Sequence, residues 1–474
     1  MTVGPKHSAP LQLELLVAAH LTLFVVGVSW AFGGNADWVR TPISLWGSLG
    51  ILLTVALLLN PETRKRFIGV VTPWVLPVLL LNLLVAASCL TPGFRNVTFG
   101  GTSLMMPMRV DWWVPSSARP ETSIRSVWLF DGIYFSCLNL ALAVRRKRTI
   151  RFILAAAVTN SFVLAAFGTA QKLAGSTGIF FGAVKSPQSA FFASFVYDNH
   201  WGAFTILMLG ACMGLILRYA HGIRGEGFFR GPALTGLVAV ALIAASIPLS
   251  GSRACSLLLL VLTSVALIQG TPRIARELRH SGITPGGTLL AIALAAALAA
   301  GSVWFVAGDV IQARASKTKE QLGEIWAQGG IGSRSVLYGD TWRMARVRPL
   351  FGWGMGTFPT VFLLFNTQES KIDHIPVVYH DAHSDWIQSV AEIGFVGTAL
   401  IGLAVLLPAR TFRASRLTAI PFFLVTALLL VAGYAWVEFP FGNVAVVLSW
   451  WFCFFCAIQY VRLTENTEEP VGEP

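Results

Sequence analysis

Residues 443–461 read NVAVVLSWWFCFFCAIQYV, a stretch without a charged side chain. At about 1.5 Å per residue, a helix of this length crosses a hydrocarbon layer roughly 30 Å thick. Similar apolar runs recur along all 474 residues, and the mean hydropathy of +0.66 reflects this repetition. The sequence therefore predicts an all-α fold, a polytopic transmembrane helical bundle of about twelve spans.

The composition excludes a soluble globular protein, because 55% of the residues are hydrophobic and only 12% are charged. A net charge of +12 would suggest nucleic acid in a soluble chain. Here, however, Lys and Arg occur in short clusters between apolar runs, which is typical of membrane topology. We expect a lipid bilayer and no nucleic acid as partner.

The predicted spans are residues 11–31, 43–60, 68–90, 126–144, 152–170, 201–219, 232–250, 254–270, 288–306, 386–408, 417–435 and 443–461.

The cysteines do not indicate a disulfide framework. All six fall in or at the edge of apolar runs, where sulfur behaves as a small hydrophobic group. Cys453 and Cys456 form a C-x-x-C motif, but two thiols one helical turn apart inside a span favour packing over redox or metal chemistry.

The basic clusters at 64–66, 145–151, 273–279 and 410–416 separate alternate spans. If the N-terminus is cytoplasmic, the positive-inside rule places every cluster in the cytoplasm. Segments 91–125, 171–200 and 307–385 then lie outside. We expect a membrane domain at 1–306 with spans one to nine, a large outer loop at 307–385, a membrane domain at 386–462 with the last three spans, and a disordered cytoplasmic tail at 463–474.

The sequence contains no Walker A motif, which argues against a cytosolic ATP or nucleotide-sugar enzyme. Polar side chains gather instead at the predicted outer ends of the spans. Ionisable side chains at membrane depth are costly and mark functional sites. Their shared side predicts one outward-facing polar cavity. These residues are Asp131, Asn199, His200, Arg253, Asp385, Gln388, Glu392 and Glu438.

Two arginines could bind an anion. Arg253 lies in the short turn Ser250–Arg253 between two spans, where it either snorkels to the membrane surface or clamps an anion such as a diphosphate. Arg334 follows Gly332 and Ser333 at a predicted helix start.

The segment His380–Asp385 leads into the span at 386–408, where Asp385, Gln388 and Glu392 form one polar stripe. His374, His380 and His383 could instead bind a metal with the nearby aspartates, but their irregular spacing argues against it.

The order and spacing of several motifs between about residues 190 and 445 resemble the O-antigen ligase and polymerase superfamily. Many relatives have Asn where Ser384 stands and Asp where Glu438 stands. The motifs are Asn199-His200 before Trp201-Gly202, Gly251-Ser252-Arg253, Arg334 running to Pro349–Phe358, Ala382–Asp385 before Glu392-Ile393-Gly394, and Glu438-Phe439-Pro440.

The resemblance implies an inverting glycosyltransferase of the bacterial inner membrane that acts at the periplasmic face. It implies an undecaprenyl-diphosphate-linked oligosaccharide as donor and an acceptor glycan or glycolipid, such as lipid A core or a growing polysaccharide, with no metal and no cofactor. Arg253 and Arg334 are then the diphosphate-binding catalytic cations, and His383 orients or deprotonates the acceptor hydroxyl. Substrate-binding roles are expected for Asn199, His200, Asp385, Glu392 and Glu438.

The sequence leaves the acceptor open, so a ligase and a polysaccharide polymerase of the same superfamily both remain. A lipid or solute transporter and a peptidoglycan-type glycan polymerase are the alternatives from other classes.

Overall fold

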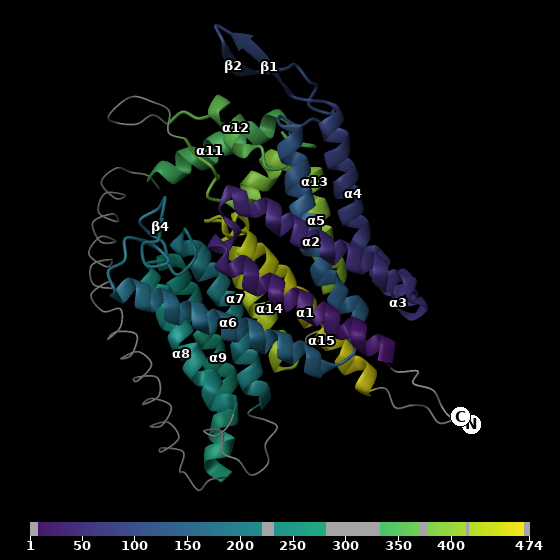
Figure 1. Cartoon of the computed structure of the whole chain (residues 1–474), viewed down its shortest axis with the longest axis vertical. Coiled ribbons are helices and arrows are strands. Elements are labelled where there is room, and N and C mark those ends of the chain that lie inside the picture. Colours follow the sequence, from purple (N-terminus) through teal and green to yellow (C-terminus); the bar gives the residue numbers. More distant parts are fainter. Residues whose placement is uncertain (1–7, 220–231, 281–331, 369–377, 414–416, 469–474) are drawn as a thin grey trace.

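The computed structural model describes residues 8–219, 232–280, 332–368, 378–413 and 417–468. Over these ranges the chain is mainly helical, and long helices lie side by side in a bundle (Figure 1). The α-helices are α1 (Ser8–Trp30), α2 (Asp37–Leu59), α3 (Pro61–Arg66), α4 (Thr72–Leu90), α5 (Pro120–Ala143), α6 (Lys147–Leu173), α7 (Asp198–Tyr219), α8 (Pro232–Ser250), α9 (Arg253–His280), α11 (Gly332–Val347), α12 (Phe358–Val361), α13 (Asp385–Ala409), α14 (Ala419–Tyr434) and α15 (Val444–Glu468).

Nine helical segments in the described ranges are long and apolar enough to cross a membrane, and Thr235–Ser250 and Ala419–Tyr434 are shorter apolar helices. The predicted polytopic helical membrane fold is therefore confirmed. Each predicted span coincides with a described helix except 288–306, which lies outside the described residues. Of the predicted tail at 463–474, the part up to Glu468 continues α15, and the rest also lies outside the described residues.

The basic cluster Arg64–Arg66 lies in a helix rather than in an open loop. Asn60 starts this helix, because its side chain accepts hydrogen bonds from the backbone N–H groups of Glu62 at 3.0 Å and Thr63 at 3.4 Å. A π turn, Phe67–Val71, then joins α3 to α4. The chain therefore turns at Asn60, before the basic residues.

Two basic clusters, Arg64–Arg66 and Arg145–Arg148, meet at one end of the bundle, which we call the basic end. Glu62 forms an ion pair with Arg145 at 2.6 Å, and Glu14, near the start of α1, forms one with Arg146 at 3.6 Å. From this end the described helices run to an opposite end, where α7, α9 and α13 begin and α14 stops.

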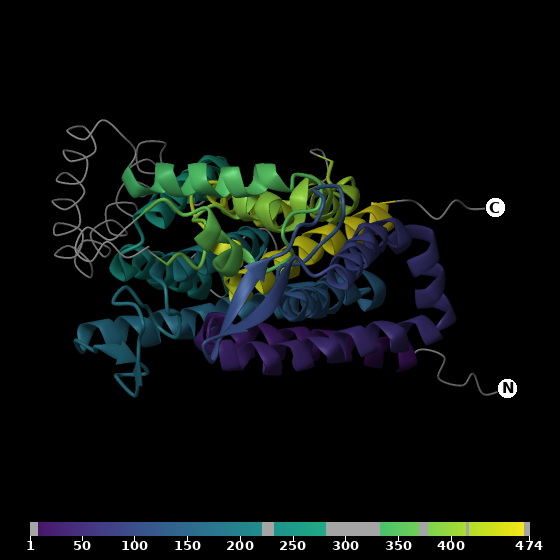
Figure 2. The same cartoon turned by 90° about the horizontal axis from the view of Figure 1, so that it is seen from above.

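Two small antiparallel hairpins interrupt the helical pattern. β1 (Phe94–Phe99) pairs with β2 (Thr102–Pro107), and β3 (Gly178–Ile179) pairs with β4 (Val184–Lys185). The first hairpin projects from the bundle beyond α4 and α5 (Figure 1), and in the view from above it is drawn in front of the helices (Figure 2). Both hairpins lie in segments predicted to be outside the membrane, but the hairpins themselves are not predicted from the sequence.

Helix α13 is broken at Gly394, where φ is 68°. The chain after α11 fills the break, because Phe395 N donates to Pro349 O at 2.8 Å and Gly354 N donates to Glu392 O at 2.7 Å. Backbone groups freed by a broken helix at membrane depth must be satisfied by protein. The glycine-rich bend that contains Gly354 therefore serves as a partner of α13.

Close approach explains the glycines at this junction. A Cβ at Gly394 would lie 2.2 Å from Leu350 O, and a Cβ at Gly352 would lie 2.4 Å from Glu392 O. The two backbones meet with no room for a side chain between them.

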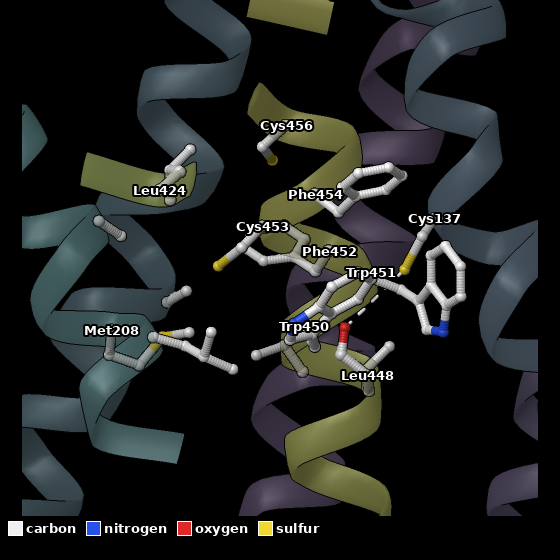
Figure 3. Close-up of a cluster of buried hydrophobic side chains, with 14 of the residues drawn as sticks. Cys137, Met208, Leu424, Leu448, Trp450, Trp451, Phe452, Cys453, Phe454 and Cys456 are labelled. Atoms are coloured by element: carbon white, nitrogen blue, oxygen red, sulfur yellow. Dashed lines mark hydrogen bonds between the residues drawn. The ribbon is translucent and has the colours of Figure 1, made fainter. Parts of the chain in front are cut away.

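The core centres on α15, whose aromatic and cysteine side chains pack among α5, α7 and α14 (Figure 3). Cys453 and Cys456 are fully buried, and all six cysteines are free. Cys137 Sγ lies 4.0 Å from Leu448 O, the contact drawn in Figure 3. Five of the six cysteines are buried in the packed interior, and Cys89 is half-buried.

Candidate active site

Glu438 lies in the turn after α14, at the end of the bundle opposite the basic end. Its backbone N–H still donates to Tyr434 O at 3.1 Å, but Pro440 disfavours a helical conformation at Phe439 and stops the helix. The Glu438 side chain is almost fully buried. A buried carboxylate is costly unless polar groups surround it.

Three side chains from distant segments converge on this carboxylate. Arg334, in the first turn of α11, donates from Nη2 to Oε1 and from Nη1 to Val437 O at 3.1 Å. Asn199, at the start of α7, donates from Nδ2 to Oε1 at 3.1 Å. Nδ1 of His383, just before α13, lies 3.3 Å from Oε2. We call Glu438, Arg334, Asn199 and His383 the Glu438 cluster.

Electrostatics keep this cluster charged. Burial alone would raise the pKa of Glu438, but the hydrogen bond from His383 and the charge of Arg334 outweigh it and hold this pKa below its ordinary value. Burial would likewise lower the pKa of Arg334, and the Glu438 carboxylate raises it instead. The carboxylate is therefore ionised at neutral pH and can only accept hydrogen bonds.

This charge state fixes the tautomer of neutral His383. Because the Glu438 oxygen can only accept, the ring proton of His383 lies on Nδ1, which leaves the lone pair on Nε2. Nε2 has no hydrogen-bond partner among the residues that the structure describes. It is placed to accept a proton from a hydroxyl.

The backbone of His383 is strained into the left-handed region, with φ at 52°. Such a conformation in a non-glycine residue costs about 1–3 kcal/mol and persists where its surroundings hold it. Here the Tyr338 hydroxyl donates to His383 O at 2.9 Å, and Phe439 packs edge-on at 4.7 Å between ring centroids. The N–H of Asp385 donates to Ala435 O at 2.9 Å, which docks α13 on the end of α14.

Arg253 is the first residue of α9, next to a residue that contacts the Glu438 cluster. Ser252 donates from Oγ to Asn199 Oδ1 at 2.5 Å, and its Oγ accepts from Cys255 N at 3.4 Å, which caps the helix. Gly251, with φ at 102°, makes the turn. The start of α9 is thus tied to Asn199.

Two further predicted residues bind backbone groups of the turn after Glu438. Asp385 accepts the N–H of Phe441 at 2.8 Å, and His200 Nε2 lies 3.2 Å from Phe439 O. Both side chains therefore shape the turn that carries Glu438.

Glu392 binds the chain that fills the break in α13. Its carboxylate accepts backbone N–H groups from Gly356 at 2.6 Å and Phe358 at 3.0 Å, and Gln388 Nε2 at 3.4 Å. Of the predicted residues, Asn199, Arg334, His383 and Glu438 are thus in direct contact, while Glu392 contacts the glycine-rich bend.

Two tyrosines beside the cluster are not predicted from the sequence. Tyr338 lies one helical turn after Arg334, a spacing that places both on one side of α11. Tyr197 precedes Asn199, whose Nδ2 donates to the Tyr197 hydroxyl at 2.8 Å. Burial raises the pKa of both tyrosines, so both hydroxyls stay protonated at neutral pH.

The alternative of a metal site involves His380, His383 and the nearby aspartates. Among the described residues, no group of three His, Cys, Asp or Glu side chains is arranged to hold an ion. Nδ1 of His383 is engaged by Glu438, and His374 lies outside the described residues.

A comparison with known protein families points to the same part of the chain. Residues 238–402 match the O-antigen ligase family model. This match confirms the resemblance to the O-antigen ligase and polymerase superfamily. A search of curated proteins found no match.

The O-antigen ligase match includes Arg253, Arg334 and His383, whereas Asn199 and Glu438 lie on either side of it. In the folded protein both flanking residues belong to the Glu438 cluster, where Glu438 contacts Arg334 and His383 of the matched range. The match supports an O-antigen ligase or polymerase type of function, and hence glycosyltransferase-like chemistry. Together with the helices, it supports a multi-pass membrane protein.

Proposed function

We propose that the protein is an inverting glycosyltransferase that transfers a glycan from an undecaprenyl-diphosphate donor to an acceptor hydroxyl. The observation that carries this proposal is the carboxylate of Glu438, which contacts a guanidinium on one oxygen and an imidazole on the other. Such an arrangement places an anion-binding group and a base beside each other. Both are needed where a hydroxyl displaces a diphosphate.

The donor diphosphate is assigned to Arg334 and Arg253. Arg334 uses two of its five N–H donors on Glu438 and Val437, and its side chain is 44% exposed, so the remaining donors are available to a ligand. Departure of the lipid diphosphate concentrates negative charge, which a preplaced guanidinium stabilises. Arg253 supplies a second cation from the start of α9, where the helix dipole also favours an anion.

The acceptor is assigned to His383. Nε2 removes the proton of the acceptor hydroxyl, and the hydroxyl oxygen forms a bond to the anomeric carbon of the donor. At the same time the bond between that carbon and the diphosphate oxygen breaks. Glu438 holds Nδ1–H and stabilises the imidazolium that forms. The imidazolium then loses the proton to water, and attack from the face opposite the diphosphate inverts the anomeric centre.

Two properties of the reaction belong to the proposal. We assign the charge stabilisation to arginines, so no divalent metal is required, and activity should survive EDTA. We also place the cluster at the periplasmic face of a bacterial inner membrane, because it lies opposite the basic end and basic residues favour the cytoplasm.

Reconstitution with two acceptors tests the proposal. Purified protein in nanodiscs is incubated with an undecaprenyl-diphosphate oligosaccharide and either lipid A core or a second lipid-linked oligosaccharide, and products are identified by mass spectrometry. A ligase elongates the first acceptor and a polymerase the second. Movement of the lipid across liposomes with no new glycosidic bond would indicate a transporter, and activity confined to lipid II would indicate a peptidoglycan-type polymerase.

A further inference from the structure

A hollow of about 680 Å³ lies at the second half of α11, away from the Glu438 cluster. Its walls come from the second half of α11 and from the chain after the turn Phe362–Leu364. Polar lining is supplied by Arg343, Arg346, Asn366 and Thr367. The hollow is therefore lined by groups that hydrogen-bond anions and sugar hydroxyls.

Asp340 fixes one wall of the hollow. Its carboxylate is buried and accepts hydrogen bonds from Thr367 N and Oγ1, both at 2.8 Å, while its other oxygen pairs with Arg343. Arg343 also donates to Phe365 O at 3.1 Å. A wall held by four hydrogen bonds is preorganised, so less entropy is lost when a ligand binds.

Counting only residues that the structure describes, the second guanidinium gives the hollow a net positive charge. Arg343 is compensated by Asp340, whereas Arg346 is exposed and has no acidic partner among the described residues. One uncompensated, bidentate cation in a hollow of this kind favours a carboxylate or a phosphate.

A row of side chains joins this hollow to the Glu438 cluster. Arg334, Tyr338, Trp342 and Arg346 follow one another at intervals of four residues, which places them on one ridge of α11. Twelve residues of helix span about 18 Å. Trp342 is 44% exposed midway along the ridge, where its ring can lie against the apolar face of a sugar.

We infer that the Arg346 hollow binds an acidic sugar, one that bears a carboxylate or a phosphate, in a glycan that extends along α11 from the Glu438 cluster. This inference rests on the proposed function for the identity of the glycan as a reaction partner. The glycan belongs to the donor or to the acceptor, and kinetics distinguish the two.

Direct binding tests the hollow without any transfer reaction. Protein in phosphatidylcholine nanodiscs is titrated with glucose 6-phosphate, glucuronate and glucose by saturation-transfer NMR. The wild type should bind the two acidic sugars about tenfold more tightly than glucose, the size of one charge-assisted hydrogen bond. Arg346→Ala should lose this preference.

A control makes the result specific. Arg125→Ala removes an exposed guanidinium that pairs with Glu121 away from the hollow, and it should keep the preference. Equal affinity for all three sugars in the wild type, or a preference for glucuronate over glucose that Arg346→Ala retains, would overturn the inference.

Kinetics assign the glycan. With acidic substrates, Arg346→Ala should raise KM about tenfold for either the donor or the acceptor and leave kcat nearly unchanged. With neutral glycans it should change neither. If acidic sugars bind at Arg346 but no transfer occurs, the proposed function fails and the binding site stands; if transfer occurs with unchanged KM for both substrates, the binding site is the part that fails.

Discussion

Nδ1 of His383 lies 3.3 Å from Oε2 of Glu438, across 55 residues of chain. The other oxygen of the same carboxylate accepts a hydrogen bond from the guanidinium of Arg334. One buried carboxylate therefore sets both the tautomer of the proposed base and the position of the proposed diphosphate ligand. Changes at Glu438 should affect donor and acceptor steps together.

Glu438→Gln keeps the size of the side chain and removes its charge. We expect turnover to fall about 100-fold or more, because the neutral amide neither stabilises the charge of the His383 imidazolium nor forms an ion pair with Arg334. Glu438→Asp keeps the charge and should recover part of the activity. Initial rates of transfer by the purified variants measure this, and near-normal turnover in Glu438→Gln would remove Glu438 from the mechanism.

The lowered pKa of Glu438 predicts a pH dependence of stability. A carboxyl group with a depressed folded-state pKa stabilises the fold above its unfolded pKa, and this contribution is lost as pH falls through the folded value. The difference in melting temperature between wild type and Glu438→Gln should thus be constant at neutral pH and shrink below the ordinary value of 4.5. A difference that shrinks already at neutral pH would contradict the ion pairs at Glu438.

Gly394 should tolerate no side chain, whereas Gly402 in the same helix should. A Cβ at Gly394 would meet Leu350 O at 2.2 Å in a backbone conformation that other residues rarely adopt, but a Cβ at Gly402 meets nothing within 4 Å. Gly394→Ala should cost about 1–3 kcal/mol or more in stability, and Gly402→Ala should be neutral or slightly stabilising. Thermal unfolding in detergent compares the two, and equal melting temperatures would show that the break in α13 is not needed.

The orientation of the bundle can be tested by cysteine labelling. In a Cys89→Ala background, Asn366→Cys should react with a membrane-impermeant maleimide added from the periplasmic side, and Lys147→Cys and Arg413→Cys should not. Cys89 is removed because it is half-buried, whereas the other native cysteines are buried. Labelling confined to Lys147→Cys and Arg413→Cys would invert the topology.

The sequence predicts the helical bundle well, because membrane spans are set by local apolar length. The helix start near Arg334 follows equally from local signals, since Gly332 and Ser333 precede it. Local chemistry also identifies polar residues at span ends, such as Asn199 and Glu438, whereas the role of His383 is implied by the resemblance to the O-antigen ligase and polymerase superfamily.

The partners of these residues are not local properties. Glu392 reads as part of a polar stripe on a regular helix, but the break at Gly394 depends on the backbone of Leu350, a contact between distant segments. That break directs Glu392 to the amides of Gly356 and Phe358. Tyr338 could have been found from its four-residue spacing to Arg334, whereas the contact between Phe439 and His383 could not.

The division of roles between Arg334 and His383 is tested most directly by measuring donor binding and turnover separately. Purified, folded Arg334→Ala and His383→Ala are compared with Arg125→Ala and His380→Ala as matched controls, using a lipid-linked oligosaccharide for equilibrium binding and for transfer. We expect Arg334→Ala to weaken donor binding and slow transfer, with poor rescue by Lys, because the charge returns without the bidentate geometry. His383→Ala should bind donor nearly as well as wild type while turnover falls about 100-fold or more. Near-normal turnover in His383→Ala, or a loss of donor binding as complete as in Arg334→Ala, would contradict the account.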